Sequence, residues 1–191
     1  MKQCWNAALA AGALALSVSA QAAPPTPEMI SFSCAGCHGT NGGSAGLSMP
    51  SLASQSKTAI IDAMKKFKSG ERPSTVMGRL AKGYTDADFE AMGNFFSRQK
   101  FHPTAQAVDK AKVAKGSDLQ EANCSRCHLD DGKDGKDDTP VMASQWLTYL
   151  QMQMDLYQSG KRKMPEKMAE KVKPLSKEDL DALDKASPKT A

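Results

Sequence analysis

Residues 34–38, Cys34-Ala35-Gly36-Cys37-His38, form the pattern C-x-x-C-H, and residues 124–128, Cys124-Ser125-Arg126-Cys127-His128, form it again ninety residues later. Two thiols followed by a histidine are the groups that attach a c-type haem, because the thiols bond to the porphyrin and the histidine reaches the iron. A redox dithiol needs no following histidine, and a structural zinc site closes with four ligands. The sequence therefore predicts two covalent haem c groups. The predicted attachment residues are Cys34, Cys37, Cys124 and Cys127, and the predicted proximal iron ligands are His38 and His128.

The ninety-residue offset extends beyond the two motifs. Pro50-Ser51-Leu52-Ala53-Ser54-Gln55 aligns with Pro140-Val141-Met142-Ala143-Ser144-Gln145, and four of the six positions are identical. Residues 67–72 align with 157–162, after which one inserted residue changes the offset to ninety-one. A duplicated unit of this kind predicts two copies of one small fold, each built around its own haem. We expect a first domain over 23–101 and a second over 102–191, with a connector at about 99–115.

Apolar residues recur at helical spacing in both copies. One stripe consists of Ala59, Ile60, Ala63, Met64 and Phe67, and the other of Leu147, Leu150, Met154 and Tyr157. Thr85 and Ser176 each precede acidic residues, which is typical of a helix N-terminus. No segment is rich in strand-forming alternation. The expected fold is mainly α, with each stripe packed against a porphyrin.

The first 22 residues have the features of a secretory signal peptide. Lys2 precedes an apolar stretch from Trp5 to Ala20, and Ala20-Gln21-Ala22 supplies a small-residue cleavage site. The apolar stretch is too short for a dependable membrane span, so no membrane anchor is expected after cleavage. The chain has five cysteines, and the fifth, Cys4, falls in this leader. Export to the periplasm agrees with the motifs, because bacteria complete c-type haem attachment outside the cytoplasm.

The distal iron ligands are predicted from the repeat. The chain has only three histidines, and His102 stands beside Pro103 in the expected connector, where an exposed position is favoured over a ligand role. Met77 lies eight residues before Thr85, and Met168 lies eight residues before Ser176. We therefore predict Met77 and Met168 as axial ligands, with Met164, one helical turn away, as the rival to Met168. The other methionines on apolar stripes, Met64, Met92, Met152 and Met154, are expected to fill the core.

The proximal histidines need a partner for their second ring nitrogen. Pro50 and Pro140 each follow the proximal histidine of their copy by twelve residues. A backbone carbonyl there could accept the histidine N–H, which would orient the imidazole and raise its basicity. Turn formation is the simpler role for both prolines.

An iron with histidine and methionine ligands has no free position for substrate, so electron transfer is expected and no catalytic residue is predicted. The chain also has no G-x-G-x-x-G pattern after a strand, so any flavin chemistry must belong to a partner. Residues 23–101 hold nine basic and six acidic side chains, and residues 102–191 hold fifteen of each. Separate acidic and basic runs in the second copy can orient a protein partner, or they can be merely solvated faces. Nothing in the sequence supports nucleic-acid binding.

Residues 74–89, Ser-Thr-Val-Met-Gly-Arg-Leu-Ala-Lys-Gly-Tyr-Thr-Asp-Ala-Asp-Phe, resemble the distal-ligand segment of the dihaem cytochrome subunits of flavocytochrome c sulfide dehydrogenases. Residues 34–40, 144–151 and 162–169 are similar to the same family. The resemblance implies two tandem class I cytochrome c-like haem domains. It also implies a heterodimer in which a flavoprotein subunit, carrying the FAD, oxidises sulfide. This chain would pass the electrons to a soluble cytochrome c.

Two alternatives remain open at the level of sequence. One is a free-standing dihaem cytochrome that carries electrons to a terminal oxidase without a flavoprotein. The other is a dihaem enzyme, such as a peroxidase or a thiosulfate dehydrogenase, which would need an open or replaceable axial position on one iron.

Overall fold

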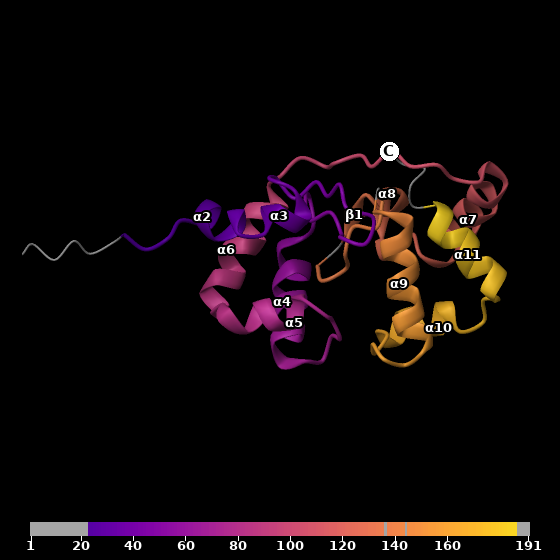
Figure 1. Cartoon of the computed structure of the whole chain (residues 1–191). Helices are drawn as coiled ribbons and strands as arrows, with labels where there is room; N and C mark the ends of the chain where they lie inside the picture. Colours follow the sequence, from indigo (N-terminus) through magenta and orange to yellow (C-terminus); the bar gives the residue numbers. More distant parts are fainter. Residues whose placement is uncertain (1–22, 136, 144, 187–191) are drawn as a thin grey trace, which may run out of the picture.

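The computed structural model describes residues 23–135, 137–143 and 145–186 (Figure 1). The predicted signal peptide, with Cys4, lies outside these residues. Within them, no helix is both long enough and apolar enough to cross a membrane. The described residues are mainly helical, as expected, and the only strand among them, β1 (Asp134–Gly135), has two residues.

The first half is built from five α-helices and one turn of 3-10 helix. They are α2 (Pro27–Phe32), α3 (Ala35–His38), α4 (Lys57–Ser69), α5 (Met77–Leu80), η1 (Ala81–Gly83) and α6 (Asp86–Ser97). Helices α2 and α4 both pack against α6. Aromatic side chains of α6 dominate the resulting core, because Phe89, Phe95 and Phe96 are each at most 5% exposed. Met64 and Met92 are buried with them, as predicted.

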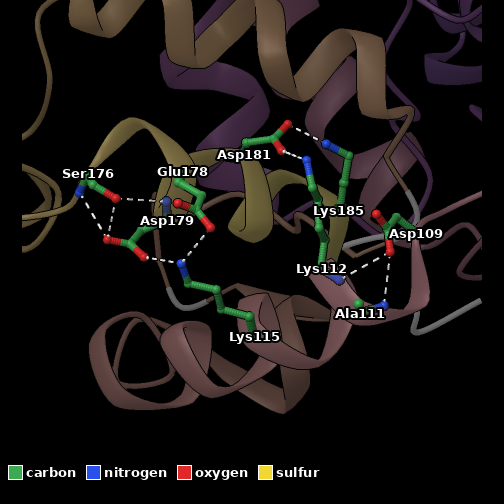
Figure 2. Close-up of polar contacts among 9 residues, drawn as sticks. All are labelled: Asp109, Ala111, Lys112, Lys115, Ser176, Glu178, Asp179, Asp181 and Lys185. Atoms are coloured by element: carbon green, nitrogen blue, oxygen red, sulfur yellow. Dashed lines mark hydrogen bonds and ion pairs between the residues drawn. The ribbon is translucent and has the colours of Figure 1, made fainter.

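The second half contains α7 (Lys110–Asn123), the short and kinked α8 (Leu129–Gly132), α9 (Leu147–Gln158), α10 (Glu166–Val172) and α11 (Lys177–Ala186). Helices α7 and α11 pack closely, and Gly116 permits this because a Cβ there would lie 2.0 Å from the Ala182 carbonyl oxygen. Ion pairs join the same helices, with Lys112 on Asp181 at 2.6 Å and Lys115 on Asp179 at 2.8 Å (Figure 2). These pairs are partly exposed, so each contributes little to stability.

The two halves differ in how well their central helix is buried. Ile60 and Met64 of α4 are buried, whereas no residue of α9 is. Met152 is 46% exposed, so the expectation that it fills the core is wrong. The physical reason is that α6 covers α4 with aromatic rings, whereas α11 has Leu180 and Ala186 where α6 has Phe89 and Phe95.

Backbone contacts repeat with the sequence. The Gly42 carbonyl accepts hydrogen bonds from the amides of residues 52 and 53, and the Gly132 carbonyl accepts them from residues 142 and 143. Both glycines have φ near +80°, a conformation that glycine adopts without steric cost. The predicted helix starts are confirmed, because the Thr85 hydroxyl accepts from Asp88 N and the Ser176 hydroxyl accepts from Asp179 N.

The segment between the halves is shorter than expected. Residues 98–109 contain no helix and run along the top of the view in Figure 1. Helix α7 then begins at Lys110, inside the range of about 99–115 that we expected for the connector. Asp109 explains the early start, because its carboxylate accepts from the amides of Ala111 and Lys112 and so caps a segment rich in Ala and Lys. His102 is exposed, as expected.

Candidate functional site

Each C-x-x-C-H motif forms a single helical turn. The His38 amide donates to the Cys34 carbonyl at 2.9 Å, and the His128 amide donates to the Cys124 carbonyl at 2.9 Å. None of the four motif cysteines takes part in a disulfide among the described residues. Burial raises the pKa of the Cys34 and Cys124 thiols, which keeps them protonated at neutral pH. Each turn therefore holds two thiols and one imidazole together.

The structure confirms the predicted partner of each proximal histidine. His38 Nδ1 donates to the Pro50 carbonyl at 2.8 Å, and His128 Nδ1 donates to the Pro140 carbonyl at 3.0 Å. A carbonyl can only accept, so Nδ1 carries the proton and Nε2 keeps the lone pair that binds a metal. Burial lowers the pKa of both histidines, which favours the neutral imidazole. This donor set fits the fifth ligand of a haem iron.

The predicted distal ligand of the first half begins a short helix. Met77 is the first residue of α5 and packs partly buried against the core of the first half. Two apolar neighbours, Val76 and Leu80, are about half exposed, at 47% and 51%. A thioether beside exposed apolar side chains fits the edge of a porphyrin, which would cover such a surface.

The second half offers two methionines at the corresponding place. Met168 lies on α10 and Met164 precedes it, just before Pro165. Met164 lines a pocket of about 550 Å³ between α9, α10 and α11, together with Tyr157, Leu175 and Leu180. The repeat places Leu175 and Leu180 where the first half has Tyr84 and Phe89. Smaller side chains therefore occupy these positions in the second half. The choice of Met168 over Met164 stays a prediction.

Two glutamines that sequence reasoning gave no role join the halves. Gln55 donates to the Val141 carbonyl at 2.8 Å and accepts from the Val141 amide at 3.0 Å. Gln145 donates to the Ser51 carbonyl at 3.0 Å and accepts from the Ser51 amide at 2.9 Å. We call Gln55 and Gln145 the clamp glutamines. Because they occupy equivalent positions in the repeat, each glutamine makes the same pair of hydrogen bonds to the opposite half. In the sequence, the only sign of these hydrogen bonds is that both copies have glutamine at this position.

Further contacts cross the same boundary. The Trp146 indole N–H donates to the Ser44 carbonyl at 2.9 Å. Arg72 donates across the boundary to the Tyr149 hydroxyl at 3.1 Å and to Gln153 Oε1 at 3.3 Å. Within the second half, Arg162 donates to the same Gln153 oxygen at 2.6 Å. Burial, together with the like charge of Arg72, lowers the pKa of Arg162. Arg72 and Arg162, which occupy equivalent positions in the repeat, therefore share the neutral side chain of Gln153 as a hydrogen-bond acceptor.

The Asp-rich run after the second motif begins with Asp130 and Asp131. Within the described residues, no group of three or more His, Cys, Asp or Glu side chains could hold a metal ion. Asp130 and Asp131 adopt positive φ angles, which agrees with a turn.

Comparison with known proteins gives matches to several cytochromes. Residues 111–183 match the family model described as cytochrome c oxidase, cbb3-type, subunit III. The cytochrome subunit of sulfide dehydrogenase from Chlorobaculum tepidum is 48% identical over 69 residues, which is 36% of this chain and 62% of that relative. The thiosulfate dehydrogenase electron acceptor of Thiomonas intermedia is 28% identical over 161 residues, covering 79% of this chain and 73% of the relative. Cytochrome c-554(548) of Halomonas halodenitrificans is 30% identical over 70 residues, covering 35% of this chain and 84% of the relative.

The fold has close counterparts among solved structures. Reduced recombinant cytochrome c4 from Pseudomonas stutzeri superposes with a TM-score of 0.74 at 23% identity, covering 85% of this chain and 95% of that one. This likeness confirms the expected fold class, which is mainly α with two tandem class I cytochrome c-like domains.

Proposed function

This chain belongs to the cytochrome c family, and from that premise we propose that it binds two haem c groups and transfers electrons as a subunit of a periplasmic, sulfide-oxidising flavocytochrome. The observation that carries the two-haem part is the same geometry at both motifs. In each half a helical turn presents two thiols, and a proline carbonyl fixes the imidazole with Nε2 free. Because the geometry of the two motifs is the same, nothing in either motif favours a single haem over two.

The residues have separate tasks in this proposal. Cys34, Cys37, Cys124 and Cys127 would hold the two groups through thioether bonds, and His38 and His128 would each supply an iron ligand through Nε2. Haem c supplies a reversible one-electron change of its iron. Met77 and Met168 would supply the second iron ligand in each half, and a thioether ligand raises the reduction potential relative to a second histidine. With both iron ligands supplied by the protein, the chain would move electrons and leave substrate chemistry to a partner.

Support for the sulfide dehydrogenase role comes from one relative. The cytochrome subunit of sulfide dehydrogenase shares 48% identity with this chain, although the match spans only 62% of that relative. We infer a flavoprotein partner that carries FAD and oxidises sulfide, and a soluble cytochrome c as the final acceptor. The periplasmic location follows from the predicted signal peptide and the chemistry of haem attachment.

The first experiment is to isolate the mature protein from its native periplasm by affinity capture. Haem content by pyridine haemochrome assay should be two per chain. A flavoprotein should copurify, and adding sulfide to the eluate should reduce both haems. A dihaem protein that elutes alone and stays oxidised with sulfide would contradict the subunit role.

A second function has an observation in its favour. The thiosulfate dehydrogenase electron acceptor of Thiomonas intermedia matches 79% of this chain, a longer stretch than the sulfide dehydrogenase relative. A free-standing dihaem carrier would explain that match. Reduction of the isolated protein by a thiosulfate-oxidising extract, with no flavoprotein present, would favour this carrier over the subunit of a flavocytochrome.

The distal ligands have their own test. Met77→Ala and Met168→Ala should each remove half of the weak long-wavelength absorption that a methionine-ligated ferric haem shows. Met164→Ala is the matched control, because Met164 lies one turn from Met168, and it should leave the band intact. Loss of half the band in the Met164 variant, with none lost in the Met168 variant, would reassign the ligand.

A further inference from the structure

We propose that the clamp glutamines are positioning residues that act crosswise, so that Gln145 tunes the haem of the first half and Gln55 tunes the haem of the second. The inference rests on the proposed binding of two haems. It adds to that function a route by which each half adjusts the axial histidine of the other.

The key observation is that one peptide unit carries both contacts. The Pro50 carbonyl, which accepts from His38 Nδ1, and the Ser51 amide, which donates to Gln145 Oε1, belong to the same planar peptide bond. In the second half, the Pro140 carbonyl accepts from His128 Nδ1 and the adjoining Val141 amide donates to Gln55 Oε1. Each proximal histidine is thus two hydrogen bonds away from a side chain of the opposite half.

Hydrogen bonds in such a chain strengthen one another. When an amide N–H is bound by an acceptor, the peptide is polarised and its carbonyl becomes a better acceptor. Gln145 Oε1 therefore strengthens the bond that the Pro50 carbonyl receives from His38, and Gln55 Oε1 does the same for His128. A stronger bond at Nδ1 makes the imidazole more basic and stabilises the ferric iron at Nε2.

The environment allows this effect to persist. Gln55 is 7% exposed and Gln145 is 3% exposed, while their backbone partners Ser51 and Val141 are each 4% exposed. Water therefore does not compete for these groups, and the low local dielectric strengthens the polar chain. Each glutamine also donates back to the carbonyl of the residue that it accepts from, so its amide is held in one orientation.

The crossing gives a signature that a merely structural contact lacks. Removing the amide of Gln145 weakens the bond at His38, so the potential of the first haem should rise while that of the second stays unchanged. Removing the amide of Gln55 should raise the potential of the second haem alone. A general loosening of the two halves would instead move both potentials in both variants.

The test is a redox titration of holo Gln55→Leu and Gln145→Leu, with each haem followed by its own paramagnetically shifted methyl signals in proton NMR. The signals are first assigned with the Met77 and Met168 variants. Haem content of the wild-type protein is measured beforehand, because fewer than two haems would overturn the proposed function itself. With two haems present, a shift confined to the opposite half supports the crossed positioning.

Trp146→Phe is the matched control. It removes another hydrogen bond between the halves, to the Ser44 carbonyl at 2.9 Å, which belongs to neither the Pro50–Ser51 nor the Pro140–Val141 peptide unit. It should leave both potentials unchanged. If the leucine variants fail to load haem, Gln55→Glu and Gln145→Glu keep the acceptor and the volume, and they should lower the potential of the opposite haem more than that of their own. Shifts in the haem of the same half, equal shifts in both haems, or no shift would overturn the proposal.

Discussion

Replacing Asp184 by asparagine should stabilise the protein at neutral pH and leave its stability at acidic pH unchanged. Asp184 lies on α11, and burial raises the pKa of its carboxyl to about 7, with the nearby Asp181 and Asp155 adding to the rise. Lys185 opposes the shift only weakly. An acid whose pKa is raised by folding binds its proton more tightly in the native state, so it weakens stability wherever the unfolded chain has already ionised.

The size of the effect follows from the shift. From 3.8 to about 7 is roughly three pKa units, and each unit corresponds to about 1.4 kcal/mol. The full value of about 4 kcal/mol is an upper bound, because the side chain keeps some solvent contact, and we expect about 2 kcal/mol. Below about pH 4 both states are protonated and the variant should match wild type. The gain should grow as the pH rises to about 7 and then stay constant.

Urea unfolding of the two holoproteins, followed by circular dichroism from about pH 4 to about pH 8, measures this difference. Asp118→Asn is the matched control, because Asp118 is an exposed carboxylate on α7, and it should change the unfolding free energy by less than about 0.5 kcal/mol. A gain from Asp184→Asn that is the same at every pH would refute the reasoning, since it would come from packing or helix propensity and not from a buried charge.

Two further substitutions and one titration test the helix contacts of the second half. Gly116→Ala should lower the free energy of unfolding in urea by about 1–3 kcal/mol, because the new Cβ would lie 2.0 Å from a backbone oxygen of α11. Gly83→Ala is the control, because no atom lies within 4 Å of a Cβ there. Equal losses in the two variants would contradict the role of close packing at Gly116. Ser176→Ala removes the N-cap of α11 and should cost about 1 kcal/mol in thermal unfolding; an unchanged melting temperature would show that the cap is unimportant. Hydrogen bonds from Lys115, and to a lesser extent from Ser176, lower the pKa of the Asp179 carboxyl to about 2. The stabilising contribution of Asp179 is therefore present above about pH 4 and is lost as the pH falls toward 2. Lys115→Met should raise the pKa of Asp179 in an NMR titration.

The sequence was most informative where a contact is local or repeated. The histidine-to-proline-carbonyl bonds could be predicted because the same twelve-residue spacing occurs twice. The helix starts at Thr85 and Ser176 could be predicted because capping depends on residues three positions apart. In both cases the chemistry is decided within one copy of the repeat.

Features that depend on how the halves meet could not be predicted. A repeat specifies two similar units but not their mutual orientation, so the contacts of the clamp glutamines had no sequence signature beyond their identity. The exposure of Met152 was also missed, because helical spacing shows that residues share a face without showing what covers it. The early start of α7 depends on the Asp109 cap, because an Ala- and Lys-rich composition does not by itself distinguish a helix from a connector.

The reciprocity of the clamp glutamines has a consequence for how the molecule is assembled. In an isologous interface, residue i of one copy contacts residue j of the other, and j of the first contacts i of the second. The contact of Gln55 with Val141 and that of Gln145 with Ser51 are related in this way, because exchanging the two repeats converts one contact into the other. Two separate copies of one such unit would have to find each other by diffusion. The connector at 98–109 replaces that search with an intramolecular encounter, and short flexible linkers give effective concentrations in the millimolar range. A few buried amides are then sufficient to fix the orientation of the two halves, because tethering has already supplied their proximity.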